Sequence, residues 1–509
     1  MDLLLNQLPA ELKAQVQLVL AERDRLQFEN QLLRQTVRLL QLEKYGPHSE
    51  KLSDQQLQLL DQEPSVTAAE VQAETERSPL PQARPQRKPN AGHPGREPLP
   101  AHLERREVIV PCSPEQKCCL HCGQERPVIG YEVTEELDVD PVHYFVKVIK
   151  REKRASHCLP EEGVVTAPCP PKIIAKSKLS NELIVELVLR KFDEHMPVYR
   201  QCLSIERDAQ VELSRQTLVE SVLAVGQLLR PVVQVLAKDL IDYGYIQADE
   251  TPVPCQTRRT PGKNHQAYMW QFSRPGGPVV FDFRMGRSRE GPKQFLNGFK
   301  GTLQCDGYAA YNDLGPGIVY AGCWSHLRRG FHKAHQLAPE DPWPLEVIDQ
   351  IRGLYQVEEQ ARGQGFSPEA RLALRQQQSR PLVEALHARI QAIGQGTTPA
   401  SQLGKACKYA LGQWPRLEVF LKDGRLEIDN NWSENGMRKI ALGRRNWLHI
   451  GSEQAGPLVA SIASVIETCA RLGINARQYL SDVLPKLPEW PINQVADLSP
   501  LTWKAAQPL

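Results

Sequence analysis

YIQADETPVP at residues 245–254 and TLQCDGYAAYN at residues 302–312 are the stretches that decide the fold. In each, a short apolar run ends at an aspartate, Asp249 in the first and Asp306 in the second. Short apolar runs bounded by turn residues are typical of strands. Around these strands, at 245–248 and 302–305, the sequence predicts a hairpin of strands at 268–273 and 279–284, a helix at 292–299 and a fifth strand at 318–321.

Three antiparallel strands followed by alternating helix and strand are the order of a ribonuclease H-like fold, a mixed α/β architecture. In that order the first and fourth strands are neighbours, so we expect Asp249 and Asp306 side by side. Paired carboxylates repel unless a cation lies between them, and such pairs suit Mg²⁺ or Mn²⁺. Two such ions can activate an attacking water or 3′-hydroxyl and stabilise the leaving oxygen of a phosphodiester. Glu250 is the runner-up for Asp249, because neighbours on a strand point to opposite faces.

A third carboxylate is expected on a helix that crosses near the sheet. The stretch RLEIDNNWSENGMRKIALGRRNW at 425–447 can begin such a helix at Asp429, Asn430 or Ser433, which places Glu434 in its first turns. Arg438 follows one turn later on the same face. The basic and aromatic residues close behind it predict a platform for a DNA strand, and they are Lys439, Arg444, Arg445 and Trp447.

The chain is expected to be multidomain, of mixed α+β class, because 509 residues exceed what one hydrophobic core usually supports. Glu434 lies 128 residues beyond Asp306 (434 minus 306), and the charged, helix-rich sequence between them predicts an α-helical insertion. The expected modules are a coiled-coil helix at 1–60, a Pro-rich basic linker at 61–107, a zinc-finger-like module at 108–172, a helical connecting domain at 173–240, a catalytic core at 241–335 and 425–455, the helical insertion at 336–424 and a helical C-terminal domain at 456–509.

The N-terminal segment carries a seven-residue repeat of apolar residues, Leu5, Leu12, Val19, Leu26, Leu33 and Leu40. Arg23 and Asn30 fall on the companion stripe, where a polar residue can specify register and a two-stranded assembly. We therefore favour a coiled coil that joins copies of the chain. The alternative is an amphipathic helix that packs on its own protein.

A cysteine cluster in PCSPEQKCCLHCG, residues 111–123, contains half of a zinc site. The proposed ligands are Cys119 and Cys122 with His157 and Cys158. Because a second CxxC is missing, the alternative is a degenerate finger that keeps its shape by packing. The intervening hairpin is the densest basic stretch before the catalytic region, and its candidate phosphate contacts are Lys150, Arg151, Lys153 and Arg154.

The overall charge is nearly balanced, with 62 Lys and Arg against 60 Asp and Glu, a net charge of +2. Affinity for nucleic acid must therefore come from local patches. We identified no signal peptide and no stretch approaching the ~18 apolar residues of a membrane span, so we expect a cytoplasmic protein without a membrane partner. The 12 cysteines are then expected as thiols or metal ligands.

Seven ordered motifs closely resemble the transposases of the insertion-sequence 66 group, of the TnpC type. They are KYGPHSEKL at 44, GREPLPAHL at 95, EEGVVTAPCPPK at 161, ADETPVP at 248, CDGYAAYN at 305, CWSHLRRGF at 323 and DGRLEIDNNWSENGMRKIALGRRNWLHIGS at 423. The resemblance implies that Asp249, Asp306 and Glu434 are the family's DDE carboxylates, and that Cys323 and His326 are its CxxH element beside the active site.

The resemblance also implies an N-terminal zipper-like segment, a zinc-binding domain, a short helical C-terminal domain and two accessory proteins of the same bacterial element. Two departures stand out: the second CxxC is reduced to His157 and Cys158, and Asn435 replaces the basic residue usual after the catalytic glutamate. His326 either positions the active site or packs the strand end.

We therefore expect a metal-dependent transposase that cleaves double-stranded DNA at element ends and joins the freed 3′-hydroxyl to target DNA. Its expected cofactor is Mg²⁺ or Mn²⁺, with Zn²⁺ in the upstream module if that site is intact. The alternatives are a catalytically inactive DNA-binding regulator derived from a transposase, and an ordinary nuclease that cuts without end specificity or joining.

Overall fold

The computed structural model describes residues 170–257 and 263–506 continuously, together with short stretches between 15 and 37 and between 144 and 166. The linker at 61–107, the expected zinc ligands Cys119, Cys122, His157 and Cys158, and the side chains of Lys150, Arg151, Lys153 and Arg154 lie outside the described residues. Two short strands belong to this upstream part, β1 (Lys153–Ala155) and β2 (Val164–Thr166), and they pair antiparallel.

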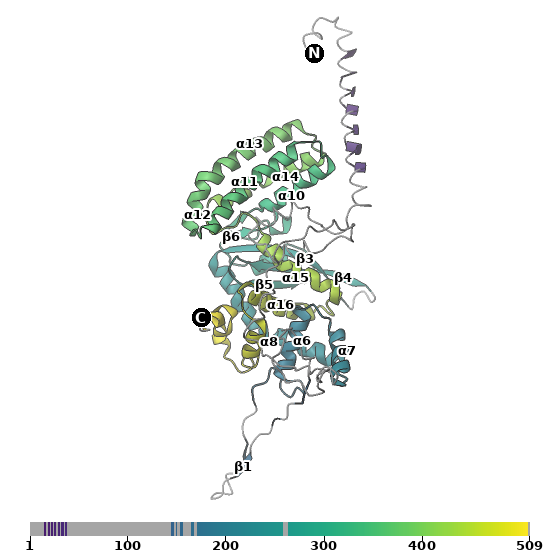
Figure 1. Ribbon diagram of the computed structural model, residues 1–509, viewed down its shortest axis with the longest axis vertical. Coiled ribbons are helices and arrows are strands. Elements are labelled where there is room, and N and C mark those ends of the chain that lie inside the picture. The colour runs from purple at the N-terminus through teal and green to yellow at the C-terminus, as the bar shows by residue number, and fades with distance from the viewer. Residues whose placement is uncertain are drawn as a thin grey trace, which may run out of the picture.

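The described positions between 15 and 37 are helical (Figure 1). Three residues of the expected apolar stripe, Val19, Leu26 and Leu33, are 68%, 52% and 64% exposed. Among the described residues, these side chains are not buried by other parts of the chain, in contrast to the alternative interpretation. Pairing of two such helices stays a prediction.

A five-stranded mixed sheet forms the centre of the molecule (Figure 1). Its strands are β3 (Tyr245–Gln256), β4 (Asn264–Ser273), β5 (Val279–Arg284), β6 (Gly301–Gln304) and β7 (Ile318–Ala321), in the order β5-β4-β3-β6-β7. The first three strands pair antiparallel, while β3, β6 and β7 pair parallel. The expected neighbourhood of the first and fourth strands is confirmed by the β3–β6 pairing.

The first strand is longer than its apolar run predicted. It continues through Asp249 to Gln256, because residues 247–256 pair with β4 along their whole length. Pairing with β6 stops at Gln247, so the far half of β3 has only one strand neighbour. Pro252 and Pro254, which lack a backbone N–H, are tolerated in this half for that reason. The expected helix at 292–299 is shorter and earlier, α9 (Glu290–Phe295), and it is followed by Gly298 with φ of +79°.

Helices cover both faces of the sheet. Alternate residues of β3 face opposite layers: Val253 and Cys255 pack with α15 (Asn431–Trp447) and α16 (Ala455–Arg471), while Ile246 and Ala248 pack with the end of α8 (Arg215–Tyr243). Asp249 therefore belongs to the α15 face and Glu250 to the opposite one. A short 3-10 helix, η2 (Ala309–Tyr311), lies on the side of Glu250.

The helices before and after the core share one hydrophobic cluster. The buried residues of α6 (Asn181–Phe192), α7 (Val198–Ala209) and α8 pack with those of α16 and α17 (Ala476–Val483). The segments at 173–240 and 456–509, expected as separate domains, thus form a single packed unit, completed by η5 (Ile492–Leu498) and α18 (Pro500–Ala505).

Within this unit α8 is long and apolar enough, by length and composition, to cross a membrane. The expectation that no stretch approaches the length and apolar character of a membrane span is therefore wrong for this helix. Of its most apolar window 39% is buried, and its apolar residues Leu218, Val222, Val225, Leu229 and Val232 are buried in the cluster shared with α6, α7, α16 and α17.

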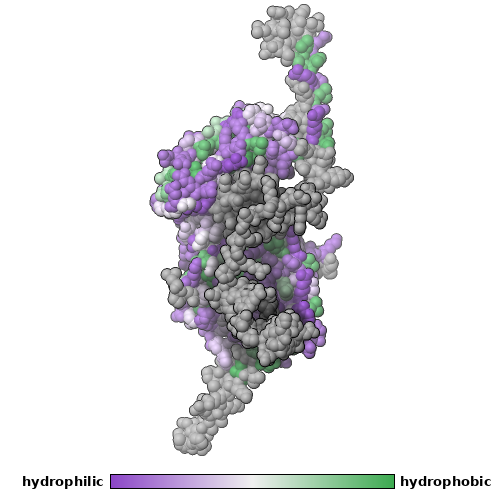
Figure 2. Space-filling model, viewed as in Figure 1, coloured by the Kyte–Doolittle hydropathy of each residue, from purple (hydrophilic) through white to green (hydrophobic). Residues whose placement is uncertain are grey.

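The expected insertion is helical and forms a bundle at the opposite end of the molecule (Figure 1). Its elements are α10 (Trp324–Leu337), α11 (Trp343–Gly363), α12 (Pro368–Leu374), a π-helical turn η3 (Arg375–Ser379), α13 (Arg380–Gly396), α14 (Gln402–Leu417) and η4 (Val419–Leu421). The surface of the bundle that Figure 2 shows is largely hydrophilic. Its core includes Trp324, in the segment expected to belong to the sheet domain, and extends to Tyr245 of β3 and Ala321 of β7.

Candidate active site

One aspartate lies on a strand and another lies just past the end of the neighbouring strand. Gln247 of β3 and Gln304 of β6 are partners in the parallel register, and each stands two residues before an aspartate, Asp249 or Asp306. Residues two apart on a strand share a face, so Asp249 belongs to the face that α15 covers. Asp306 lies just past the end of β6 and close enough for its charge to act on Asp249. Glu434 lies in the first turn of α15. The structure therefore brings all three expected carboxylates together.

The pKa of the Asp249 carboxyl reflects the proximity of these carboxylates. Burial raises the pKa of its carboxyl well above the usual range, and the negative charges of Glu434, Glu250 and Asp306 raise it further. Its Oδ1 accepts the backbone N–H of Glu250 at 2.9 Å, which lowers the pKa only in part. Carboxylates that oppose one another in this way are relieved by a bound cation.

Glu250, the alternative to Asp249, is engaged on the opposite face. Its side chain is 2% exposed and accepts hydrogen bonds from Arg287 Nε at 2.9 Å and from the Tyr311 hydroxyl at 2.6 Å. Burial raises the pKa of Glu250, while Tyr311 and Arg287 lower it. Both of its oxygens thus have protein donors, and the geometry favours Asp249 as the carboxylate that faces Glu434.

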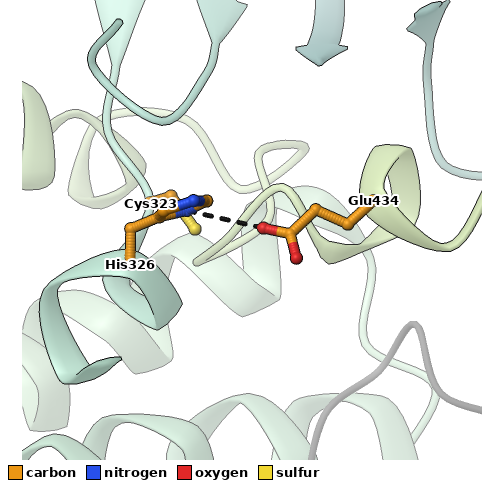
Figure 3. A group of neighbouring side chains, drawn as sticks. All are labelled: Cys323, His326 and Glu434. Carbon is orange, nitrogen blue, oxygen red and sulfur yellow. Dashed lines mark ion pairs between the residues drawn. The ribbon is translucent and has the colours of Figure 1, made fainter. Parts of the chain in front are cut away.

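Glu434 meets the start of α10 across the site (Figure 3). Its Oε2 accepts a hydrogen bond from Arg329 Nη2 at 2.5 Å, and its Oε1 lies 3.4 Å from His326 Nδ1. Cys323, which precedes α10, completes a group whose ligand atoms all lie within 4.8 Å of one another. The expected proximity of Cys323 and His326 to the carboxylates is thus observed. Burial lowers the pKa of His326, and Arg329 lowers it further against the opposing effect of Glu434.

Buried glutamines hold the segment that leads into α15. Gln247 Nε2 donates to the carbonyl of Asp429 at 2.8 Å, and Gln304 Nε2 donates to that of Glu427 at 2.9 Å. The Ser433 backbone N–H donates to Gln247 Oε1 at 3.3 Å, and Gln271 of β4 donates to the Ser433 hydroxyl at 3.2 Å. All three glutamines are fully buried. They fix where Glu434 stands relative to the two aspartates.

These glutamines and Arg329 are site residues that the sequence analysis missed. A usable signal was present for two of them: Gln-Ala-Asp at 247–249 and Gln-Cys-Asp at 304–306 repeat one spacing on adjacent strands. An amide side chain in an apolar strand needs a hydrogen-bond partner when it is buried, so its position predicts a contact with another segment of the chain.

The contact between α15 and β4 is close. A Cβ atom on Gly436 would lie 2.4 Å from Gln271 Oε1, so only glycine fits without displacement. Asn435, the departure noted from the family pattern, is buried next to it.

The basic residues and Trp447 of the expected DNA platform on α15 differ in their exposure. Arg438 and Arg445 are exposed. Lys439 turns inward, 3.3 Å from Glu467 and 3.6 Å from Asp193, and Trp447 lies under Lys191 Nζ at 5.4 Å from the ring centroid.

Arg444 occupies an intermediate position in this set. It donates to Thr251 Oγ1 at 3.2 Å and to the carbonyl of Pro252, both in β3. Lys439, Arg444 and Trp447 therefore make contacts within the protein, and a DNA contact for any residue of the platform stays a prediction.

Comparison with known proteins identifies the class of protein to which the chain belongs. The model described as Transposase IS66 family matches residues 176–457, which include the whole sheet, the bundle and α15. The model described as IS66 C-terminal element matches residues 464–501, and the model described as Transposase C of IS166 homeodomain matches residues 32–108. These matches support a transposase, a class that acts on DNA and generally uses divalent metal.

The chain belongs to the IS66 family of transposases, as the sequence motifs predicted. It is similar to three proteins of Sinorhizobium fredii (strain NBRC 101917 / NGR234), described as uncharacterized proteins y4qI, y4jD and y4hP. The identities are 30% over 490 residues, 32% over 429 residues and 28% over 438 residues. These alignments cover 92%, 80% and 81% of this chain and 88%, 82% and 78% of the relatives.

Proposed function

We propose that the protein is a DDE transposase that cleaves the ends of an insertion sequence and transfers the freed 3′-hydroxyl strand to target DNA. The observation that carries the proposal is the convergence of Asp306 and Glu434 on Asp249. The strand order, with the first and fourth strands adjacent, supports a ribonuclease H-like core.

The residues present fit a divalent metal. Glu434 Oε1 is buried without a hydrogen-bond partner, and the pKa of Asp249 is raised by the carboxylates around it. Asp249, Asp306 and Glu434 would hold Mg²⁺ or Mn²⁺, since these ions prefer carboxylate oxygens. Bound there, the metal would activate the attacking oxygen and stabilise the leaving oxygen of a phosphodiester.

The chain's own residues set the geometry for that chemistry. Arg329 holds Oε2 of Glu434 through a hydrogen bond, and Gln247 and Gln304 hold the backbone that precedes Glu434. The exposed Arg438, one turn after Glu434, and the exposed Arg445, in the last turn of α15, are available for phosphate contacts. Binding energy for DNA would thus be delivered beside the reacting bond.

Other parts of the proposal rest on sequence. The heptad repeat would join copies of the chain, so that two element ends are held together, and Cys119, Cys122, His157 and Cys158 would form a zinc-finger-like DNA-binding module. Accessory proteins of the same element would assist, and the reaction would take place in the cytoplasm.

The test is an assay of end cleavage and strand transfer with Mg²⁺ on DNA carrying the terminal sequences of the host element. Asp249→Asn, Asp306→Asn and Glu434→Gln should each abolish both steps. Asp313→Asn is the matched control, because this exposed aspartate follows Asp306 closely in the chain but is 86% exposed. Activity retained in any of the first three would remove that residue from the site.

The same assay separates the alternatives. Cutting without joining or end preference would indicate an ordinary nuclease. Specific binding of the ends by the wild type, with neither step at any Mg²⁺ or Mn²⁺ concentration, would indicate a DNA-binding regulator.

A further inference from the structure

Three side chains of different chemistry converge at the start of α10 (Figure 3). They are the Cys323 thiol, the His326 ring and the Glu434 carboxylate, and their ligand atoms lie within 4.8 Å of one another. Cys323 comes from the turn that follows β7, His326 from the first turn of α10 and Glu434 from the first turn of α15. The group thus joins the sheet domain and the bundle to the helix that carries the third carboxylate.

Two atoms of this group are buried and have no hydrogen-bond partner, namely His326 Nδ1 and Glu434 Oε1. They face each other at 3.4 Å. Two ligands bound 2.0–2.1 Å from one tetrahedral zinc ion lie about 3.3 Å apart, so this separation matches a shared ion. These two atoms form an ion pair when the ring is protonated, but neither has a hydrogen bond, and two buried ligand atoms at that separation are the second observation that points to a metal.

The remaining atoms of the group are already held in place. Arg329 Nη2 bonds Glu434 Oε2 at 2.5 Å, and Arg329 Nη1 lies 3.4 Å from His326 Nε2. The Asn430 backbone N–H donates to Cys323 Sγ at 3.5 Å. Such outer contacts orient metal ligands. The positive charge of Arg329 opposes a dication, so it limits the affinity of the site.

The donor set selects a class of ion. Mg²⁺ and Ca²⁺ take oxygen ligands, whereas thiolate, imidazole and carboxylate together suit Zn²⁺ and Co²⁺. Three protein ligands leave a fourth position open. We propose that Cys323, His326 and Glu434 form a site for Zn²⁺ or a similar transition metal, in which Cys323 and His326 are ligands of this site alone and Glu434 is shared with the carboxylate site for Mg²⁺.

Sharing Glu434 makes the two sites compete, a consequence that rests on the proposed function. With Zn²⁺ bound, Glu434 Oε1 is held toward α10 and is withdrawn from Asp249 and Asp306. Zn²⁺ therefore inhibits the Mg²⁺-dependent reaction. The site thus makes the reaction subject to inhibition by Zn²⁺ through the third carboxylate.

The experiment measures metal binding first and activity second. Full-length protein freed of metal by chelation is titrated with Zn²⁺ by calorimetry and with Co²⁺ by absorbance, where a thiolate ligand gives a charge-transfer band. Cys323→Ser and His326→Gln should each bind one equivalent fewer than the wild type, which also subtracts any metal held by the upstream cysteines. Cys202→Ser is the matched control, because this half-buried cysteine of α7 is outside the group.

The two variants protect the test against misfolding, since circular dichroism identifies a variant that does not fold and the other then decides. Arg329→Gln should bind Zn²⁺ more tightly than the wild type, because the opposing charge is gone. Unchanged stoichiometry and an unchanged Co²⁺ spectrum in the folded variants overturn the proposal.

In the activity arm, Zn²⁺ should inhibit Mg²⁺-dependent cleavage by the wild type, and whatever activity Cys323→Ser retains should be insensitive to it. Equal sensitivity of the two overturns the competition. Failure of the proposed function is distinguishable: the wild type would then cleave no ends under any condition, while the loss of one equivalent in the variants would still be measured.

Discussion

Replacing Arg375 with methionine should loosen the segment that carries Glu434, although Arg375 lies in the helical bundle. The guanidinium group has five N–H donors, and each has an acceptor. Nε and Nη2 bond the two oxygens of Glu358 at 2.6 and 2.8 Å. The other donors bond the backbone carbonyls of Phe420, Asp423 and Leu426 at 2.8, 3.1 and 2.7 Å. The residue thus clamps the chain just before α15.

The magnitude follows from burial. The side chains of Arg375 and Glu358 are 1% and 0% exposed. Although burial raises the pKa of Glu358, hydrogen bonding by Arg375 and the charges of Arg375 and Arg371 hold it below its usual value. Removing one partner of such a pair costs about 3–5 kcal/mol, because a buried charge and buried carbonyls lose their partners. The opening equilibrium of the segment should therefore rise about 10²- to 4 × 10³-fold, since every 1.4 kcal/mol is a factor of ten.

Hydrogen–deuterium exchange of the amides between 420 and 434 measures this directly. The Glu427 and Ser433 amides, which bond the Tyr245 hydroxyl and Gln247, should lose protection by that factor. End cleavage at saturating DNA should slow, while DNA affinity should be unchanged, because the exposed arginines of α15 are not altered.

Two further variants serve as an intermediate case and as a control. Arg375→Lys keeps the charge but has three donors instead of five, and it should fall between the wild type and Arg375→Met. Arg380→Gln, an exposed arginine of the same helical stretch, should exchange like the wild type. If Arg375→Met leaves exchange between 420 and 434 unchanged, the clamp does not hold this segment and the reasoning fails.

Three further predictions concern other parts of the fold. Gly436→Ala should lower the free energy of unfolding by about 1–3 kcal/mol, measured by chemical denaturation, because its Cβ would lie 2.4 Å from the buried Gln271 amide; an unchanged midpoint would show that the helix can shift freely. Burial, with a smaller effect of a nearby arginine, lowers the pKa of Lys191 to about 8, so the charged form is disfavoured in the folded state and stability should rise with pH between about 8 and 10.5. Lys191→Met should therefore be more stable than the wild type at pH 7 by at most about 3 kcal/mol, and this gain should shrink toward pH 10.5; a pH-independent difference contradicts the argument. Tyr311→Phe removes a 2.6 Å hydrogen bond to Glu250 and should cost about 1.5–3 kcal/mol, whereas a melting temperature equal to that of the wild type would mean that the carboxylate repartners.

Much of the sheet could be predicted because its strands are short apolar runs bounded by turn residues. The strand at 318–321 and the hairpin strand at 279–284 have the expected bounds, and the pairing of β3 with β6 follows from the strand order. The continuation of β3 past Asp249 could not be predicted in this way. That half contains Pro252 and Pro254, and it is a strand only because β4 and the backbone at Ile450 provide partners.

The site was predictable where a carboxylate is itself the signal, and not where its partner is distant in sequence. Asp249, Asp306 and Glu434 could be named from local context. The role of Arg329 depends on a contact across 105 positions, and the environment of Lys439 depends on Glu467 of α16. Lys439 directly follows Arg438 in the sequence, but only the packing of α15 decides which of the two side chains faces solvent.

The loop between α11 and α12 separates the chain into two parts that carry different members of the carboxylate set. Asp249 and Asp306 precede this loop, which contains Gly365 with φ of +63°, and Glu434 follows it. A chain cut here would yield two polypeptides, each lacking part of the site, whose reassociation would be favoured by the bond between Glu358 on one and Arg375 on the other. The protein is therefore suited to complementation from two co-expressed halves, and strand transfer would report their reunion.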